Sequence, residues 1–266
     1  MNIYYTKRKN FAMRYFLILQ YAGTPYGGWQ RQPHNHNTVQ ECVETALQKL
    51  FGHAITVFAS GRTDVGVHAC GQTVHFDSDK HLLPYKVQNG CNHFLDDGIR
   101  VMDAKMVEDD FHARYSAKSK SYEYLFYLGE MCPLMRDRAW RVPSKRGEVF
   151  DLESAQKALE CFVGRHNFVS YMSSGSSIKS TTRTVLSASL QQVPNPYSQD
   201  SLYKLEICAN GFLYNMVRKI IAHLVQVGKG EAAASEIQKA LSQHAPSVRL
   251  VAPACGLYLK RVSYEI

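Results

Sequence analysis

Hydrophobic and polar residues repeat along this chain with two periods, and each period predicts a different kind of element. A period near 3.6 is typical of a helix with one buried face, and a period of two is typical of a half-buried strand. Together they predict a mixed α+β protein. The expected strands are residues 14–21, 99–106, 121–128, 202–209 and 257–264. The expected helices are residues 38–51, 84–94, 151–163, 214–227 and 234–242.

The helix over residues 38–51 has the clearest signals at both ends. Thr38 and Glu41 match a capping box, in which each side chain binds an unpaired backbone N–H at the helix start. Gly52 follows the last apolar position and is expected to end the helix. Its apolar stripe consists of Val39, Cys42, Val43, Ala46, Leu47 and Leu50. This segment is therefore interpreted as core structure.

A short motif, residues 61–69, places one carboxylate, Asp64, in a glycine-bracketed turn beside Arg62. The apolar run 55–59 before it predicts a buried strand, and the alternation over 74–77 after it predicts a half-buried one. A carboxylate at a strand end can be held rigidly at the rim of a cleft. Taken alone, Asp-x-Gly is also typical of a turn in which the Asp side chain binds nearby backbone.

Charge narrows the class of partner. The chain has 266 residues, enough for one large domain or two ordinary ones, with a net charge of +8. A pI near 9.1 suggests an acidic partner, nucleic acid first, although charge alone fits a merely basic soluble protein about equally well. The basic residues recur beside aromatics, which suits a folded groove that contacts phosphates and stacks bases. Examples are Arg114 with Tyr115, Lys118 and Lys120 with Tyr122, and Arg138 and Arg141 around Trp140.

Other classes of site receive little support. The seven cysteines are scattered without C-x-x-C spacing, which fits free thiols in a reducing cytoplasm better than disulfides or zinc. His34 and His36 could hold a metal, but no third ligand lies nearby in the sequence, so we expect no metal. No apolar run approaches the roughly 20 residues needed to span a membrane. Residues 1–14 lack the apolar region of a signal peptide, and a mitochondrial presequence, the other reading, would need an amphipathic stripe that is not clear there; we therefore expect a cytoplasmic protein.

A few side chains outside the 61–69 motif stand out on their elements. Arg218 lies beside the apolar stripe of its helix, so its guanidinium needs a carboxylate partner unless its stem carries the charge to solvent. Lys120, Tyr122 and Tyr124 alternate onto one face of a strand, which is also typical of ordinary packing. Leu257 begins the strand 257–264, where an apolar residue normally belongs to the core.

A series of short motifs, taken in order, resembles the TruA family of tRNA pseudouridine synthases almost from end to end. The segment 61–69 resembles the family's catalytic motif without a gap. Any one motif is weak, but the ordered set is highly specific. The matching segments are 21–30, 38–40, 61–69, 111–114, 120–124, 164–168, 182–184, 215–218 and 252–257.

The resemblance implies a fold and an assembly. It implies two similar α+β halves, RRM-like or ferredoxin-like, joined across a central catalytic cleft. We place a polar extension at residues 1–10, one half at 11–113 and the other at 114–266. Members of the family act as homodimers on tRNA without a cofactor or metal, and the same is expected here.

The resemblance also implies a mechanism. Asp64 would be the nucleophile that attacks either ribose C1′ or uracil C6, and Arg218 would keep it ionised and aim it. Tyr122 would stack on the base and help to remove the C5 proton. Leu257 would form the floor of the base pocket.

The remaining implied roles concern the RNA around the reacting uridine. Arg62 would fill the space left when the target base flips out of its stem, because the glycosidic bond is not reachable inside a stacked helix. Lys120 would contact the substrate.

Three functions follow from these observations. The first is pseudouridine formation at positions 38 to 40 in the anticodon arm of tRNA. The second is a non-catalytic, basic RNA-binding or RNA-chaperone protein. The third is a relative that modifies other RNAs. The carboxylate separates the first from the second, since an acidic residue in a basic cleft repels phosphate and does not help a protein that only binds.

Overall fold

The computed structural model describes residues 12–144, 147–175, 178, 180–242 and 248–265. The expected extension at residues 1–10 lies outside these ranges. The helices are α1 Val39–Phe51, α2 Pro84–Phe94, α3 Leu152–Glu160, α4 Met216–Gly228 and α5 Ala234–Ser242. The strands are β1 Met13–Tyr21, β2 Phe58–Ala59, β3 His68–Ser78, β4 Ile99–Val107, β5 Ser119–Leu128, β6 Trp140–Val142, β7 Gly164–Asn167, β8 Thr182–Val193, β9 Leu202–Ala209 and β10 Leu257–Ser263.

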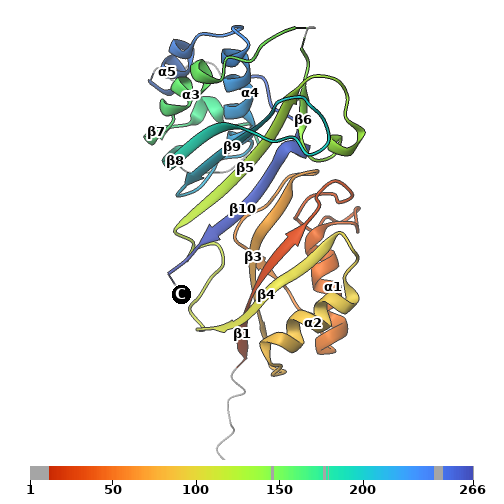
Figure 1. Ribbon diagram of the computed structural model, residues 1–266. Helices are drawn as coiled ribbons and strands as arrows, with labels where there is room; N and C mark the ends of the chain where they lie inside the picture. The colour runs from red at the N-terminus through yellow and green to blue at the C-terminus, as the bar shows by residue number, and fades with distance from the viewer. Residues whose placement is uncertain (1–11, 145–146, 176–177, 179, 243–247, 266) are drawn as a thin grey trace, which may run out of the picture.

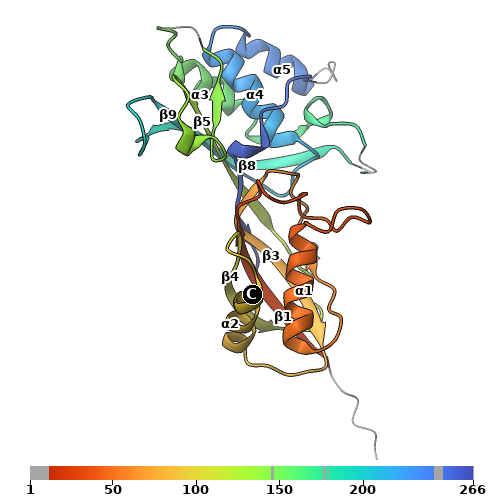
Figure 2. The same cartoon turned by 90° about the vertical axis from the view of Figure 1, so that its right-hand side faces the viewer.

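One continuous, mostly antiparallel sheet runs through the molecule in the order β4-β1-β3-β10-β5-β9-β8-β7. Helices α1 and α2 lie beside one end of this sheet and α3, α4 and α5 beside the other, with β5 and β10 between them (Figures 1 and 2). The predicted α+β class is confirmed. None of the helices in the described ranges has the length and apolar character that crossing a bilayer requires.

Strand β10 joins the two ends of the sheet. It pairs in parallel with β3, where Leu259 lies opposite Ala69, and antiparallel with β5, where Leu259 lies opposite Tyr122. The turn that carries Asp64 comes directly before β3. Strand β10 therefore sets the position of that turn relative to the Tyr122 strand.

The two largest apolar clusters of the described residues lie one against each group of helices. The first contains the predicted face of β1 (Tyr15, Leu17, Leu19), packed with residues of α1. The second contains the apolar stripe of α4 packed on β5 and β9. Residues Leu259 and Val262 of β10 belong to the first core although they are far from it in sequence. Helices α2 and α5 and strand β9 begin and end at the predicted residues.

The prediction for the strands around Asp64 was wrong in burial. His75 of β3 is only 3% exposed, although its alternation with Val74 and Phe76 indicated a solvent-facing side. The second face of β3 is covered by Phe58, whose ring stacks on His75 at 5.1 Å, and by the segment that carries Phe111. The apolar run 55–59 forms only the two-residue strand β2. Burial by segments that are distant in sequence cannot be recognised from the local alternation of apolar and polar residues.

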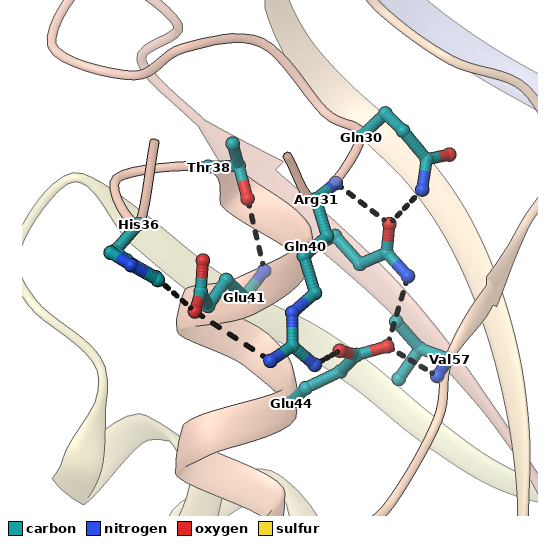
Figure 3. A network of polar contacts seen from close by, with 8 residues as sticks. All are labelled: Gln30, Arg31, His36, Thr38, Gln40, Glu41, Glu44 and Val57. Atoms are coloured by element: carbon teal, nitrogen blue, oxygen red, sulfur yellow. Dashed lines mark hydrogen bonds and ion pairs between the residues drawn. The ribbon is translucent and has the colours of Figure 1, made fainter. Parts of the chain in front are cut away.

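The capping box of α1 is half formed. The Thr38 hydroxyl accepts a hydrogen bond from the Glu41 N–H, as predicted. The Glu41 carboxylate does not return to Thr38, because it contacts the His36 ring at 2.9 Å and lies 3.9 Å from Arg31 (Figure 3).

No group of three or more potential ligands for a metal occurs in the described part of the chain.

A polar network next to this cap ties three segments together. The Gln40 Oε1 atom accepts from the Arg31 N–H and from the Gln30 side chain (Figure 3). Glu44 accepts from the Gln40 amide and from the Val57 N–H. The loop after β1 and the residues before β2 are thus both fixed to α1.

Strand β8 and the exact start of helix α4 were not predicted from the sequence. Strand β8 has buried apolar side chains only at Val185 and Leu190, and its register with β9 shifts between Val185 and Ser187, so no alternation is visible. Helix α4 begins at Met216, two residues later than predicted, because Asn215 has a left-handed backbone with φ 60°.

We expect stability to fall as the pH is lowered from about 7 to about 4.5, with His75 contributing. Burial, the nearby His112 and the charge of Arg14 lower the pKa of His75 to about 4. The unfolded chain then binds a proton more readily than the folded chain, so the contribution of neutral His75 is complete above its unfolded pKa. That contribution is lost as the pH falls toward the folded pKa. Urea unfolding midpoints across this range measure the effect.

The matched control is His93, an exposed histidine on α2. We expect His75→Gln to flatten the pH dependence of the midpoint and His93→Gln to leave it unchanged. The same slope in all three proteins would show that His75 is not the titrating group.

Candidate active site

Asp64 occupies a tight turn between β2 and β3. The turn closes with a hydrogen bond from the Val67 N–H to the Asp64 carbonyl at 3.1 Å, and Gly66 supplies the positive φ of 80° that the turn requires. The Asp64 side chain is 36% exposed. It is therefore partly desolvated but still reachable from the cleft.

The buried side-chain amide of Gln72, on β3, is hydrogen bonded to the segment before Asp64. Its Oε1 accepts from the Ser60 hydroxyl and its Nε2 donates to the Gly61 carbonyl, both at 2.8 Å. The Tyr21 and Thr63 hydroxyls are hydrogen bonded to each other at 2.8 Å in the same buried region. Since buried polar groups need such partners, this network fixes the backbone of residues 60–63.

Lys120 supports the same loop from β5. Its ammonium donates to the Ser60 carbonyl, and burial, with a further contribution from Arg114, lowers its pKa to about 8. A Cβ atom at position 61 would lie 2.9 Å from the Lys120 Nζ atom, so glycine lets the lysine approach this closely. Lys120 also lines the cleft, and its predicted contact with substrate stays a prediction.

Arg218 of α4 faces Asp64, as the resemblance implied. Its Nη1 atom lies 3.5 Å from the Asp64 Oδ2 atom, which is an ion pair longer than a good hydrogen bond. Its Nε donates to the Ala252 carbonyl at 2.7 Å, and its own carbonyl accepts from the Ala252 N–H. The guanidinium is thus held by the segment before β10 as well as by its helix.

Asn215 also positions Arg218, and this role was missed from the sequence. Its Oδ1 accepts from the Arg218 Nη1 at 2.9 Å, and its Nδ2 donates to the Ser173 hydroxyl at 3.1 Å. It is the one non-glycine residue with positive φ in the described ranges. The available signal was an asparagine directly before an apolar-periodic helix, because asparagine tolerates this conformation better than most residues.

Two opposing effects set the ionisation of Asp64. Burial raises the pKa of its carboxyl, while the charge and hydrogen bonding of Arg218 lower it, with a net rise. The nearby phenol of Tyr122 also has a raised pKa, first because it is buried and then because of Tyr21 and the charge on Asp64. Tyr122 is therefore a neutral phenol at pH 7.

These groups line one cleft of about 970 Å³, a size typical of ligand sites. Tyr122 packs edge-to-face on Phe212 at 5.0 Å within it. Leu257, 6% exposed, lies opposite Tyr124 in the β10–β5 pairing and also reaches the cleft. Arg62 is exposed at the same cleft. The structure thus brings together the six residues to which the resemblance gave a role, and their individual roles stay predictions.

Comparison with known proteins shows the family to which the chain belongs. A family model described as tRNA pseudouridine synthase matches residues 17–116 and 158–265. The tRNA pseudouridine synthase A of Acetivibrio thermocellus is 40% identical over 250 residues, covering 93% of this chain and 98% of that protein. The protein of that name from Ruminiclostridium cellulolyticum is 38% identical, with the same coverage of both chains.

A third relative, the tRNA pseudouridine synthase A of Bacillus sp. (strain KSM-64), is 35% identical over 251 residues, 94% of this chain and 99% of that protein. The two matched regions include the turn of Asp64 and the helix of Arg218. The chain therefore belongs to the tRNA pseudouridine synthase family of isomerases.

Proposed function

We propose that this protein isomerises uridine to pseudouridine in tRNA, at positions 38 to 40 of the anticodon arm. The observation that carries the proposal is the charge pattern of the cleft. Among the described residues that line it, Asp64 is the one carboxylate, and it lies among cationic groups. These cations are Arg62, Arg114, Lys120 and Arg218. A protein that only binds RNA gains nothing from a carboxylate there, because it repels phosphate.

In this proposal Asp64 is the nucleophile. By one route its carboxylate oxygen bonds ribose C1′ as the C1′–N1 bond breaks; by the other it first bonds uracil C6. On the first route the detached base turns and C5 bonds C1′ as the C1′–O bond to Asp64 breaks. On the second route the C1′–N1 bond breaks in the adduct, the base turns, C5 bonds C1′, and the C6–O bond to Asp64 breaks last. The C5 proton leaves and N1 gains one, so the product is an isomer of the substrate. A carboxylate suits both routes because it is a modest nucleophile and a good leaving group.

The neighbours of Asp64 act on orientation and on the proton. Arg218 aims the carboxylate, and its ion pair at 3.5 Å supports ionisation. Tyr122 stacks on the uracil, and Leu257 closes the floor of the pocket. Since Tyr122 enters the reaction as a neutral phenol, it can accept the C5 proton only if it passes its own proton on. Arg62, which is exposed at the cleft, takes the space of the base that flips out of its stem.

We also propose that the protein is a cytoplasmic homodimer. A two-fold partner presents a longer basic surface to an L-shaped RNA than one chain does, and free thiols at all seven cysteines suit a reducing compartment. Light scattering at micromolar concentration should give twice the mass of one chain, 30.1 kDa. Cell fractionation should place the protein with soluble cytoplasmic markers. A monomer, or a membrane-bound pool, would contradict the respective proposal.

Replacing the carboxylate should abolish product while RNA remains bound. The Asp64→Asn variant is expressed in cells that lack the wild-type protein, and pseudouridine is mapped in their bulk tRNA. We expect no pseudouridine at positions 38 to 40. Phosphate contacts hold the RNA, whereas Asp64 acts only at the reacting nucleotide, so filter binding should change little. Tritium release from C5-labelled uridine in tRNA measures turnover directly.

The matched control is Asp97→Asn, which neutralises an exposed aspartate outside the cleft and should restore modification. Substantial turnover by folded Asp64→Asn would remove Asp64 from the nucleophile role. Modification restored by wild type only in other RNAs would favour a relative with a different substrate.

The pH profile should reveal the ion pair. Burial raises the pKa of Asp64 and Arg218 lowers it, so Arg218→Gln leaves the effect of burial unopposed. The reaction needs the ionised carboxylate, and its rate falls as the pH falls through the pKa of Asp64. In Arg218→Gln we expect this fall to begin at higher pH, with kcat/KM about 100-fold lower at neutral pH.

Arg218→Lys provides the comparison, because it keeps the charge but not the planar fork. In Arg218→Lys, the pH at which the rate begins to fall should lie closer to the wild-type value than it does in Arg218→Gln. If the rate begins to fall at the same pH in all three proteins, the guanidinium does not set the pKa of Asp64.

A further inference from the structure

A cluster of rings at the cleft has no part in the mechanism above. The Phe58 ring stacks on His75 with centroids 5.1 Å apart, and His75 contacts the His112 ring at 4.5 Å. His112 in turn lies 4.4 Å from the Tyr115 ring. The inner ring, His75, is buried, whereas Phe58 is 49% and Tyr115 is 77% exposed. The cluster therefore exposes the rings of Phe58 and Tyr115 to solvent, while the His75 ring beneath them is buried.

Backbone hydrogen bonds hold the two histidine rings of the cluster in place. The His75 Nδ1 atom accepts from the Ala113 N–H at 3.1 Å. The His112 Nδ1 atom accepts from the Arg114 N–H at 3.1 Å and from the Tyr115 N–H at 3.4 Å. The turn that carries Tyr115 is thus folded around the His112 ring. A preformed surface of this kind loses little entropy when a ligand stacks on it.

The surroundings indicate which ligand fits. Phe58, His112 and Tyr115 line the same cleft as Asp64. Arg114 lies over the Tyr115 ring, with its guanidinium carbon 5.8 Å from the centroid, and it lines the cleft too. Aromatic faces with arginine beside them are typical of sites that stack unpaired bases and contact their phosphates. Charge thus favours an RNA nucleotide over an apolar peptide or a second copy of this basic chain.

We propose that Phe58, His112 and Tyr115 form a second nucleobase subsite, which stacks an unpaired base of the same RNA beside the flipped uridine while Arg114 contacts its phosphate. The inference rests on the proposed function. It adds a requirement for the substrate: a nucleotide flanking the target must leave its own stack. The subsite acts on RNA binding, and the chemistry stays with Asp64.

The test uses an anticodon-arm RNA hairpin with the target uridine and, in separate molecules, 2-aminopurine or an abasic residue at each flanking position. With wild-type protein, we expect 2-aminopurine at one flank to change fluorescence on binding, and the abasic residue at that flank to weaken binding roughly tenfold. The double variant Phe58→Ala/Tyr115→Ala should bind the intact hairpin about as weakly as wild type binds the abasic one. It should also be insensitive to the abasic change.

Two controls make the result specific. Tyr85→Ala removes an exposed tyrosine of α2 that does not line the cleft, and it should behave as wild type. Tyr115→Phe keeps the ring and should also bind as wild type, with thermal melting to confirm the fold of each variant. A tenfold effect of the abasic residue that persists in the double variant, or no effect in wild type, would overturn the subsite.

Failure of the proposed function has a separate signature. If wild type releases no tritium from the C5-labelled hairpin or from full-length tRNA, the enzyme assignment fails regardless of stacking. If wild type turns over normally and the abasic change has no effect on binding, only the subsite fails.

Discussion

The ion pair between Asp64 and Arg218 is the contact on which the site depends, because its two partners come from opposite ends of the sheet. Asp64 comes just before β3, and Arg218 lies on a helix that packs on the other end of the sheet. Strand β10 pairs with both β3 and β5, and Ala252 just before it binds Arg218 through backbone and side chain. A one-residue slip of β10 would turn every side chain of that strand to the other face. The pairing register of one strand thus sets the 3.5 Å separation of the two charges.

The backbone before Asp64 is held by Gln72 and Lys120, whose polar atoms are hydrogen bonded to it. A buried amide such as Gln72 costs free energy unless its hydrogen bonds are made, and a partly satisfied network is worse than an apolar one. Here Gln72 binds both Ser60 and Gly61, and Lys120 binds Ser60 from the other side. The loop is anchored on its inner face, and the Arg62 side chain stays exposed at the cleft.

Local patterns predicted most of the helices and strands, because their apolar periods match the faces that they bury. They failed where a partner distant in sequence decides the outcome. His75 is buried by the segment around Phe111, and strand β8 has too few buried side chains to show a period. The role of Asn215 depends on Ser173 and Arg218 together. The meeting of Asp64 with Arg218 was likewise expected only from the family resemblance, since no spacing rule links positions so far apart.

Burial and Arg218 shift the pKa of Asp64 in opposite directions, and the nucleophilic role proposed for this carboxylate depends on both effects. Desolvation raises the pKa of the carboxyl and makes the carboxylate more reactive, but unopposed it would favour the protonated, unreactive form. RNA entering the cleft removes more water from a side chain that is 36% exposed in the free protein. The same loss of water lowers the local dielectric and strengthens the attraction of Arg218 for the charge. The ion pair therefore offsets the desolvation that substrate binding itself imposes, and it does so most strongly when the reacting base is in place.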